Sequence, residues 1–455
     1  MHTATARTEA IAPAPFTTRV EAAHPTDHRA LRFLTAGSVD DGKSTLIGRL
    51  LFDSRAILAD QIDSLSRRAG AAQLADGLPG FDLSHLTDGL EAEREQGITI
   101  DVAYRYFATR QRKFIIADAP GHEQYTRNMV TAAAGSDAAV VLVDITKLDT
   151  HSLPVKLLTQ TRRHALLAHL LRVPGIVFAV NKLDAVDDPG RAYAAVHDAL
   201  LRFAHEARFE VAGVVPVSAL RGDNVTQAPD ASWSAWYKGP TLLRLLESLP
   251  TTREPAEGAL RIPVQFVARV GGGTGSQPRT LWGRIAQGTV TIGDTVQLFP
   301  SGERAAVAEV HRAGDRVGRA VAGQSASIVL DRQLDVSRGD WIASPGTLRE
   351  TRRFSATLAW LDTEPAVVGR KYLLRHGNRW VQARIGAVES RLDIHTLVAT
   401  DAHELAVNDI GHVVIETQQP LPIEPYAHNR VGGALIVVDP ASHRTSGALL
   451  VQGAA

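Results

Sequence analysis

Short apolar runs alternate with helix-length amphipathic segments over the first half of the chain. The runs that predict strands cover residues 31–35, 114–118, 138–144, 176–181 and 214–218. The patterns that predict helices cover residues 44–51, 159–171, 191–206 and 241–249. Strands and helices in alternation are typical of a parallel sheet with helices on both faces. We therefore predict an α/β domain over residues 31–250.

The helical pattern stops after this domain. Short β-type runs, separated by Gly-Asp and Gly-Gln turns, then predict strands at residues 261–269, 281–285, 295–298, 305–310 and 326–330. A second all-β stretch begins near Phe354 and continues to Val451. Short strands with this spacing favour small barrels. The expected fold is an α/β domain followed by two all-β barrel domains. We place domain II at residues 258–350, domain III at residues 352–455 and a flexible N-terminal tail at residues 1–30.

Composition narrows the possible partners. Lys plus Arg and Asp plus Glu are equal at 49 each, so no bulk charge attracts the chain to nucleic acid, which disfavours RNA and gives no reason to expect DNA. The chain has no cysteine, which excludes disulfides and thiolate chemistry. No apolar run reaches the roughly 18 residues of a membrane span, and the N-terminal stretch lacks a signal-peptide core. We expect a cytoplasmic protein without a membrane partner.

A phosphate-binding loop (P-loop) lies between the first predicted strand and helix. Residues 37–44 match G-x-x-x-x-G-K-[ST] in full, in the strand–loop–helix context that the motif requires. Lys43 is expected to bind the β- and γ-phosphates and to assist catalysis, and Ser44 is expected to offer its hydroxyl to Mg²⁺. A plain glycine turn with a surface lysine is the alternative. The predicted contacts are Gly37, Ser38, Val39, Asp40, Asp41, Gly42, Lys43, Ser44 and Thr45.

Two further motifs end apolar strands. In Asp118-Ala119-Pro120-Gly121 the carboxylate can hold Mg²⁺ through water, and the Gly121 N–H can approach the γ-phosphate; alone, this sequence is also a common turn.

In Asn181-Lys182-Leu183-Asp184 the last carboxylate can accept hydrogen bonds from guanine N1–H and its exocyclic amine, which adenine lacks. Loss of these two hydrogen bonds, which leaves a buried carboxylate unsatisfied, costs about 1.5–3 kcal/mol of binding free energy. Ser218, Ala219 and Leu220 follow the last strand and are expected to add backbone contacts to guanine O6. The three motifs in this order predict GTP.

These residues resemble the translational class of GTPases. In that class a Gly-Ile-Thr-Ile segment is switch I and Asp-x-Pro-Gly-His is switch II, and here these sequences occupy residues 97–100 and 118–122. The resemblance implies that Thr99 completes Mg²⁺ coordination and that His122 orients the attacking water. It also implies that Val39 and Ile98 flank that histidine. For His122 the alternative is a polar loop residue.

A more specific resemblance is to the large GTPase subunit of bacterial sulfate adenylyltransferase. It extends over residues 31–51, 88–107, 112–129, 159–164 and 429–450. An elongation factor would be expected to have histidine at Ser38 and Asp41. The resemblance implies a GTP hydrolase with GTP and Mg²⁺ as cofactors. It also implies a small catalytic subunit, in a heterodimer or higher heteromer, that forms adenosine 5′-phosphosulfate and pyrophosphate from ATP and sulfate.

Some stretches depart from that family. The chain has additional residues around 147–157, and the Gly-rich stretch 271–279, which we interpret as a flexible hairpin, differs from the usual sequence. One P-loop is present, so a fused adenylylsulfate kinase is not expected. The alternatives are a tRNA-delivering translation factor, which would need a basic face across the barrels, and a regulatory GTPase that binds only protein.

Two clusters are interpreted as structural. His164 and His169 are five positions apart, off the face of a helical metal pair, so packed or solvated histidines are expected. Trp233, Trp236 and Tyr237 are expected to serve core packing or a partner contact.

Overall fold

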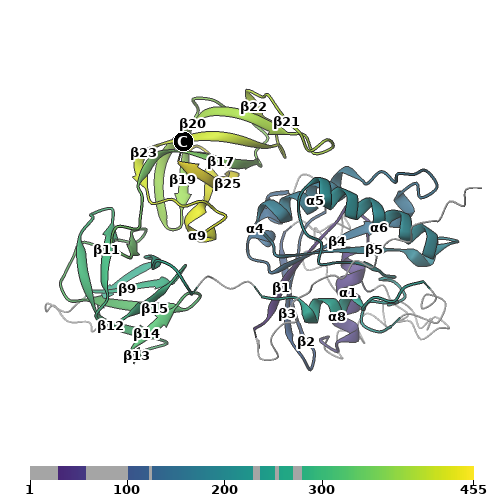
Figure 1. The fold of residues 1–455 in the computed structure, drawn as a ribbon, viewed down its shortest axis with the longest axis horizontal. Helices are drawn as coiled ribbons and strands as arrows, with labels where there is room; N and C mark the ends of the chain where they lie inside the picture. Colours follow the sequence, from purple (N-terminus) through teal and green to yellow (C-terminus); the bar gives the residue numbers. More distant parts are fainter. Residues whose placement is uncertain are drawn as a thin grey trace, which may run out of the picture.

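The computed structural model describes residues 29–57, 83, 101–121, 126–228, 236–251, 256–269 and 279–454. A domain of helices packed on a sheet is followed by two all-β domains, as Figure 1 shows. The predicted fold class is confirmed. The predicted tail at residues 1–30 lies almost wholly outside the described residues, as does the Gly-rich stretch 271–279.

The first domain contains a six-stranded sheet with the order β2-β3-β1-β4-β5-β6. Its strands are β1 (Leu31–Ala36), β2 (Ala103–Ala108), β3 (Lys113–Asp118), β4 (Ala138–Asp144), β5 (Gly175–Asn181) and β6 (Gly213–Pro216). The five strands that the apolar runs predict are present and parallel. The sheet is nevertheless mixed, because β2 pairs antiparallel with β3 at the edge. Our prediction missed β2, whose exposed Tyr104 and Tyr106 interrupt the apolar pattern.

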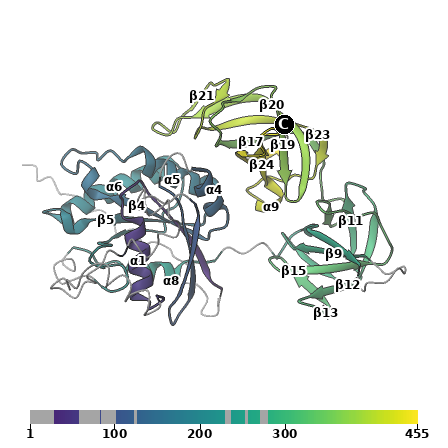
Figure 2. The same cartoon turned by 180° about the vertical axis from the view of Figure 1, so that it is seen from behind.

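Helices cover both faces of this sheet, as Figures 1 and 2 show. On one face lie α1 (Lys43–Asp53) and α8 (Leu242–Ser248), and on the other lie α4 (Thr126–Ala134), α5 (Thr159–Leu170) and α6 (Pro189–Glu206). Val140 and Leu142 of β4 pack in the hydrophobic core under α1 and α8, while Val141 and Val143 pack in the core under α4, α5 and α6. Because successive side chains of a strand point to opposite faces, a central strand must be apolar at every position.

Domain II is a barrel of short strands, which are β7 (Arg261–Pro263), β8 (Phe266–Arg269), β9 (Arg279–Arg284), β10 (Thr289–Thr291), β11 (Thr295–Phe299), β12 (Arg304–Arg312), β13 (Asp315–Val317), β14 (Arg319–Val321), β15 (Ser325–Leu330) and β16 (Trp341–Ala343). The apolar run 261–269, predicted as one strand, is two. After Pro263 the chain changes neighbours: Val264 N donates to Asp340 O, and Gln265 N donates to Trp282 O. This change of partner joins the two ends of the sheet.

Domain III contains a closed barrel, because β19 pairs with both β24 and β20 at the ends of the strand order β19-β24-β25-β17-β23-β20. Its elements are β17 (Thr351–Trp360), β18 (Ala366–Val367), β19 (Lys371–His376), β20 (Arg379–Leu392), β21 (Ala399–Thr400), β22 (Glu404–Leu405), β23 (Ile410–Leu421), α9 (Arg430–Gly433), β24 (Ala434–Val438) and β25 (Thr445–Ala454).

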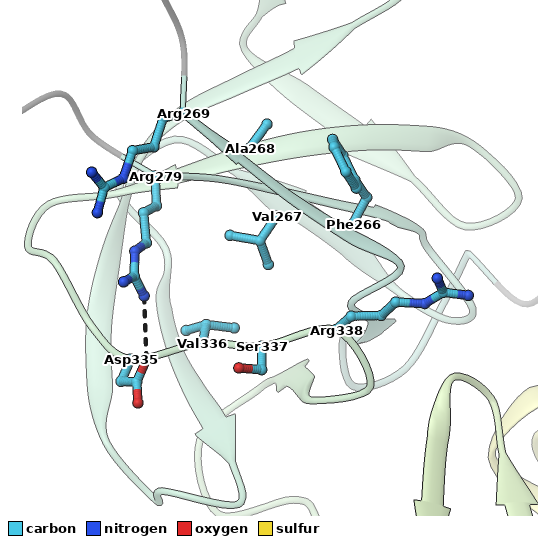
Figure 3. A pocket seen from close by; sticks show the side chains of 9 residues that line it. All are labelled: Phe266, Val267, Ala268, Arg269, Arg279, Asp335, Val336, Ser337 and Arg338. Atoms are coloured by element: carbon cyan, nitrogen blue, oxygen red, sulfur yellow. Dashed lines mark hydrogen bonds and ion pairs between the residues drawn. The ribbon is translucent and has the colours of Figure 1, made fainter. Parts of the chain in front are cut away.

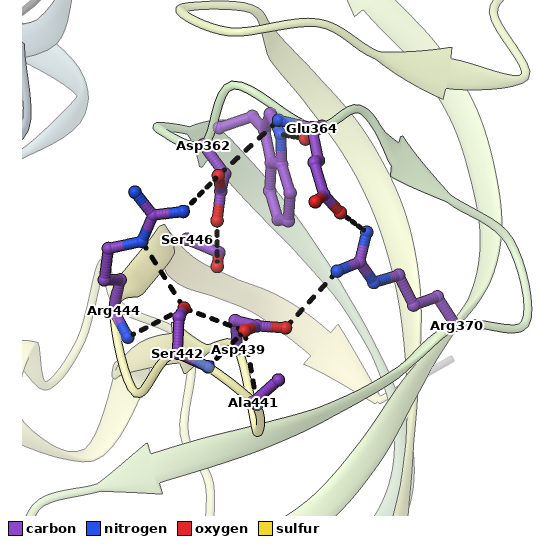
Figure 4. A network of polar contacts seen from close by, with 9 residues as sticks. Asp362, Glu364, Arg370, Asp439, Ala441, Ser442, Arg444 and Ser446 are labelled. Atoms are coloured by element: carbon purple, nitrogen blue, oxygen red, sulfur yellow. Dashed lines mark hydrogen bonds and ion pairs between the residues drawn. The ribbon is translucent and has the colours of Figure 1, made fainter.

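A polar network crosses one end of this barrel (Figure 4). Arg370 joins Glu364 at 2.6 Å to Asp439 at 3.3 Å, and Ser446 Oγ donates to Asp362 at 2.6 Å. The network ties together loops that leave different strands of the barrel.

Domain III contacts both of the other domains. Tyr426 Oη donates to Leu171 O at 2.8 Å, just after α5, and Arg162 of α5 donates to the backbone of Ile394 and His395. Toward domain II, Arg261 pairs with Glu424 at 2.6 Å, Arg379 pairs with Asp340 at 3.2 Å, and the Trp341 ring stacks on His376.

Candidate guanine-nucleotide site

The P-loop follows β1 and ends in α1, so the first turn of the helix faces the loop. Gly42 is the N-cap residue of α1, has φ +92° and leaves the helix without a side-chain cap. A Cβ on Gly42 would lie 2.4 Å from Asn181 Nδ2, so the position requires glycine for conformation and for space. The uncapped N–H groups at this end suit an anionic ligand.

Lys43 lies inside this loop and is almost fully buried. Its Nζ donates to Gly37 O at 3.1 Å and to Ser38 O at 2.8 Å. Burial lowers the pKa of Lys43 from its ordinary value, and nearby Asp118 opposes that shift. A Cβ on Gly121 would lie 2.3 Å from Lys43 Nζ. The fold therefore brings Gly121 of the Asp-x-Pro-Gly motif against the P-loop lysine.

The residues predicted to hold Mg²⁺ supply the oxygen ligands that the ion prefers. Asp118 ends β3, is 2% exposed and accepts a hydrogen bond from Thr35 Oγ1 at 3.3 Å. Ser44 lies in the first turn of α1. One carboxylate with a hydroxyl suits Mg²⁺ bound mainly through substrate phosphates. In the described ranges no group of three or more His, Cys, Asp or Glu side chains could form an all-protein metal site.

Asn181 and Lys182 connect the end of β5 to the P-loop. Asn181 Oδ1 accepts from Ala219 N at 2.9 Å, and its Nδ2 donates to Asp41 O at 2.8 Å. Lys182 has φ +65°, and its Nζ donates to Asp40 O at 2.7 Å. The motif predicted to recognise the base thus also fixes the backbone of the phosphate-binding loop.

The Asp184 carboxylate lies beyond these contacts. Its side chain is 16% exposed, and its Oδ2 is 3.9 Å from Arg221 Nε. Ser218 is fully buried, whereas Leu220 is exposed and its carbonyl accepts from Arg49 Nη2. The P-loop, Asp118, Asn181–Asp184 and Ser218–Leu220 therefore gather at the carboxyl end of the sheet, where open α/β sheets bind ligands. Their individual roles stay predictions.

The sequence prediction missed two residues at this site. Asp144 ends β4 with its side chain fully buried and lies 2.7 Å from Lys182 Nζ. Although burial opposes it, the pKa of Asp144 is lowered by hydrogen bonds from Lys182 and Thr146. Lys147 follows three residues later and contacts the P-loop. Asp144 ends an apolar strand, as Asp118 and Asn181 do, and that signal could have found it.

Several predicted site residues lie outside the described part of the chain: Ile98, Thr99, His122 and all of switch I. Trp233 lies outside it too.

The clusters interpreted as structural are packed in the structure. Burial lowers the pKa of His164 to about 3, so that ring is a neutral packed side chain. His169 packs on Phe209 with ring centroids 5.4 Å apart. Trp236 packs on Tyr193 at 5.5 Å and on Tyr237 at 6.2 Å.

A cavity of about 430 Å³ lies in domain II, well apart in sequence from these motifs (Figure 3). Exposed Phe266 and Arg338 lie on one side of it, and Arg279 pairs with Asp335 on the other at 3.3 Å. None of the predicted nucleotide-binding residues lines this cavity.

Comparison with known families agrees with the geometry. Residues 28–252 match the family described as elongation factor Tu GTP-binding domain, and residues 353–452 match the family described as GTP-eEF1A C-terminal domain-like. A solved structure of sup35 complexed with GDP is 20% identical over 93% of this chain and 94% of that one, with a TM-score of 0.41. The fold and the motifs define a GTPase of the elongation-factor class.

Full-length similarity is more specific. The chain is 41% identical over 431 residues to sulfate adenylyltransferase subunit 1 of Laribacter hongkongensis, covering 93% of this chain and 85% of that protein. It is 42% identical to the subunit 1 of Chromobacterium violaceum, over 92% of this chain and 85% of that one. It is 44% identical to the bifunctional enzyme NodQ of Azospirillum brasilense, over 93% of this chain but only 66% of NodQ. The chain belongs to the sulfate adenylyltransferase subunit 1 family.

No helix in the described ranges is long and apolar enough to cross a membrane.

Proposed function

We propose that this chain is the GTP-hydrolysing subunit of a sulfate adenylyltransferase. In this proposal, GTP hydrolysis drives formation of adenosine 5′-phosphosulfate and pyrophosphate from ATP and sulfate on a small catalytic subunit. The observation that carries it is the full-length similarity to proteins named sulfate adenylyltransferase subunit 1. The product contains a phosphate–sulfate anhydride, so its formation is uphill and requires coupling to a second reaction.

The proposed residue roles combine the sequence motifs with the geometry of the site; the role of Thr99 rests on the motif alone. Lys43 binds the β- and γ-phosphates, because its buried ammonium lies inside the P-loop beside Gly121. Ser44 and Asp118 hold Mg²⁺, Asp118 through water, and Thr99 completes the set. When bound, Mg²⁺ would neutralise charge on the phosphate oxygens. Asp184 accepts from guanine N1–H and its amine.

His122 orients the attacking water, and Val39 and Ile98 flank it. This part of the proposal rests on the sequence motif, since His122 directly follows Asp-x-Pro-Gly. A water-orienting residue acts mainly in the transition state, so its loss should affect turnover more than GTP affinity.

Coupling requires that the partner's active site respond differently to the GTP- and GDP-bound forms. A tRNA-delivering translation factor is the less supported alternative, because the relatives similar over the full length carry the subunit 1 name. The equal numbers of acidic and basic residues also give no bulk attraction to RNA.

The test is reconstitution of the purified chain with the small subunit from the same organism. The isolated chain should hydrolyse GTP slowly and should form no adenosine 5′-phosphosulfate. Adding the small subunit should start synthesis and accelerate GTP hydrolysis together. His122→Ala is the matched variant: it should bind GTP nearly as the parent does but lose about 100-fold or more in hydrolysis and in GTP-driven synthesis.

Two results would contradict the proposal. Sustained adenylyl transfer by the isolated chain would mean that it contains an active site of its own. Synthesis by the complex that does not respond to GTP would exclude the coupling.

A further inference from the structure

The P-loop of this chain contains a buried carboxylate. Asp41 is fully buried, and its Oδ2 accepts a hydrogen bond from Ser38 N at 2.6 Å. Its backbone carbonyl accepts from Asn181 Nδ2. A carboxylate within a loop that binds phosphate has the same sign of charge as the ligand. Such a charge is tolerated only where a cation compensates it.

Lys147 supplies that cation. It ends the short 3-10 helix η3 (Ile145–Lys147), which directly follows β4. Its Nζ lies 2.8 Å from Asp41 Oδ1 and donates to Val39 O at 2.6 Å. The same ammonium is 3.8 Å from Asp144 Oδ2. One side chain from outside the P-loop therefore contacts both the carboxylate and the backbone of that loop.

The other two lysines at the site are engaged elsewhere. Lys43 Nζ donates to the carbonyls of Gly37 and Ser38, and Lys182 Nζ lies between Asp144 and the carbonyl of Asp40. Of the three, Lys147 lies within ion-pair distance of the Asp41 carboxylate. Lys43 and Lys182 belong to recognised nucleotide motifs, whereas Lys147 belongs to none.

We propose that Lys147 is a positioning residue of the guanine-nucleotide site: it neutralises Asp41 and holds the Val39–Asp41 backbone in the conformation that accepts the triphosphate. The inference rests on the GTP binding in the proposed function and is independent of the sulfate chemistry. Without Lys147, Asp41 loses its ion pair and keeps its negative charge within the loop that binds phosphate. The affinity for GTP should fall more than the affinity for GDP, because GTP carries the additional negative charge of the γ-phosphate.

A double-mutant cycle on the full chain tests the pairing. Equilibrium affinities for GTP and GDP are measured for the parent, Lys147→Ala, Asp41→Asn and the double variant, together with melting temperatures without nucleotide. Lys147→Ala should lower the affinity for GTP about 10-fold or more, and the affinity for GDP by a smaller factor. In the Asp41→Asn background the same change should lower GTP affinity several-fold less than it does in the parent, because the carboxylate is gone and only the hydrogen bond to Val39 O is lost. Lys147→Arg should restore part of the GTP affinity.

Lys156→Ala is the control, because Lys156 is an exposed lysine of the same loop; its GTP affinity should equal the parent's.

Three outcomes would overturn the inference. Lys147→Ala could bind GTP as the parent does. Its full effect could persist in the Asp41→Asn background. It could lower the melting temperature and weaken GTP and GDP equally without rescue by arginine, which would indicate a purely structural role. A parent chain that binds no guanine nucleotide would instead refute the proposed function.

Discussion

Asp184 follows β5 with a mostly buried carboxylate, 3.9 Å from Arg221 Nε. Because we propose that this carboxylate accepts hydrogen bonds from guanine N1–H and its amine, Asp184→Asn should lower the affinity for GTP by about 10- to 100-fold. The same variant should improve binding of xanthosine triphosphate, since xanthine has a carbonyl where guanine has the amine. Competition binding with the two nucleotides measures both changes. If the variant binds both as the parent does, Asp184 does not recognise the base.

Single residues of the site were predictable where a motif requires their type. Gly42, Lys43 and Asp184 belong to motifs whose spacing is local in the sequence, so no tertiary information was needed to select them. Lys147 was not predictable in this way. Its contact with Asp41 depends on β1 and β4 being neighbours in the sheet, which places the ends of two distant segments side by side.

Among the elements, the contact between the P-loop and the end of β5 depends on one glycine. Gly42→Ala would place a Cβ 2.4 Å from Asn181 Nδ2 and would force a left-handed backbone on alanine. We expect a loss of GTP affinity of about 10-fold or more, because the N-terminus of α1 must move. Nucleotide titration measures it.

The control for this prediction is Gly135→Ala. Gly135 precedes β4, and a Cβ there would meet nothing within 4 Å. GTP affinity should therefore stay at the parent's value. Equal affinities in the Gly42→Ala variant and the parent would show that Asn181 can move aside at little cost.

The strands differ in how well the apolar pattern of the sequence predicts them. β4 and β5 were predicted almost to the residue, because a strand buried on both faces is a continuous apolar run. β2 was missed because it lies at the edge, where Tyr104 and Tyr106 are exposed. The run 261–269 was predicted as one strand because the pattern cannot show that the chain changes partners after Pro263.

At the scale of the whole molecule, the contact between the two barrels contains a buried titratable ring. His376 is fully buried, stacks on Trp341 of domain II with ring centroids 5.1 Å apart, and its Nε2 lies 3.0 Å from Gly432 O. Burial lowers the pKa of His376 to about 4 from 6.5, with Arg379 adding to the shift, and Gly432 O and Glu424 opposing it. The folded form therefore resists protonation.

The sign of the pH dependence follows. The unfolded chain binds the proton near pH 6.5 and the folded chain only near pH 4, so this contribution to stability is complete above pH 6.5 and is lost as the pH falls toward 4. Each pH unit in that window costs up to about 1.4 kcal/mol. Melting temperatures of the parent should fall between pH 7.5 and pH 5, and they should fall less in His376→Leu.

His403→Gln is the control for this prediction, because His403 is exposed. It should show the same pH dependence as the parent. If the melting temperature of His376→Leu falls between pH 7.5 and pH 5 as much as the parent's does, His376 contributes nothing to the loss of stability in acid.

The sequence by itself determined the nucleotide class, the order of the domains and the central strands. Each of these depends on local patterns: motif spacing, apolar runs and the change from helical to β-type periodicity. The tertiary structure decided which distant residues meet. The pairing of β1 with β4 brings Lys147 to Asp41, the packing of α5 on domain III brings Tyr426 to Leu171, and the docking of the barrels buries His376 against Trp341. A contact between segments far apart in the chain has no local signature, because it forms only when the intervening chain folds.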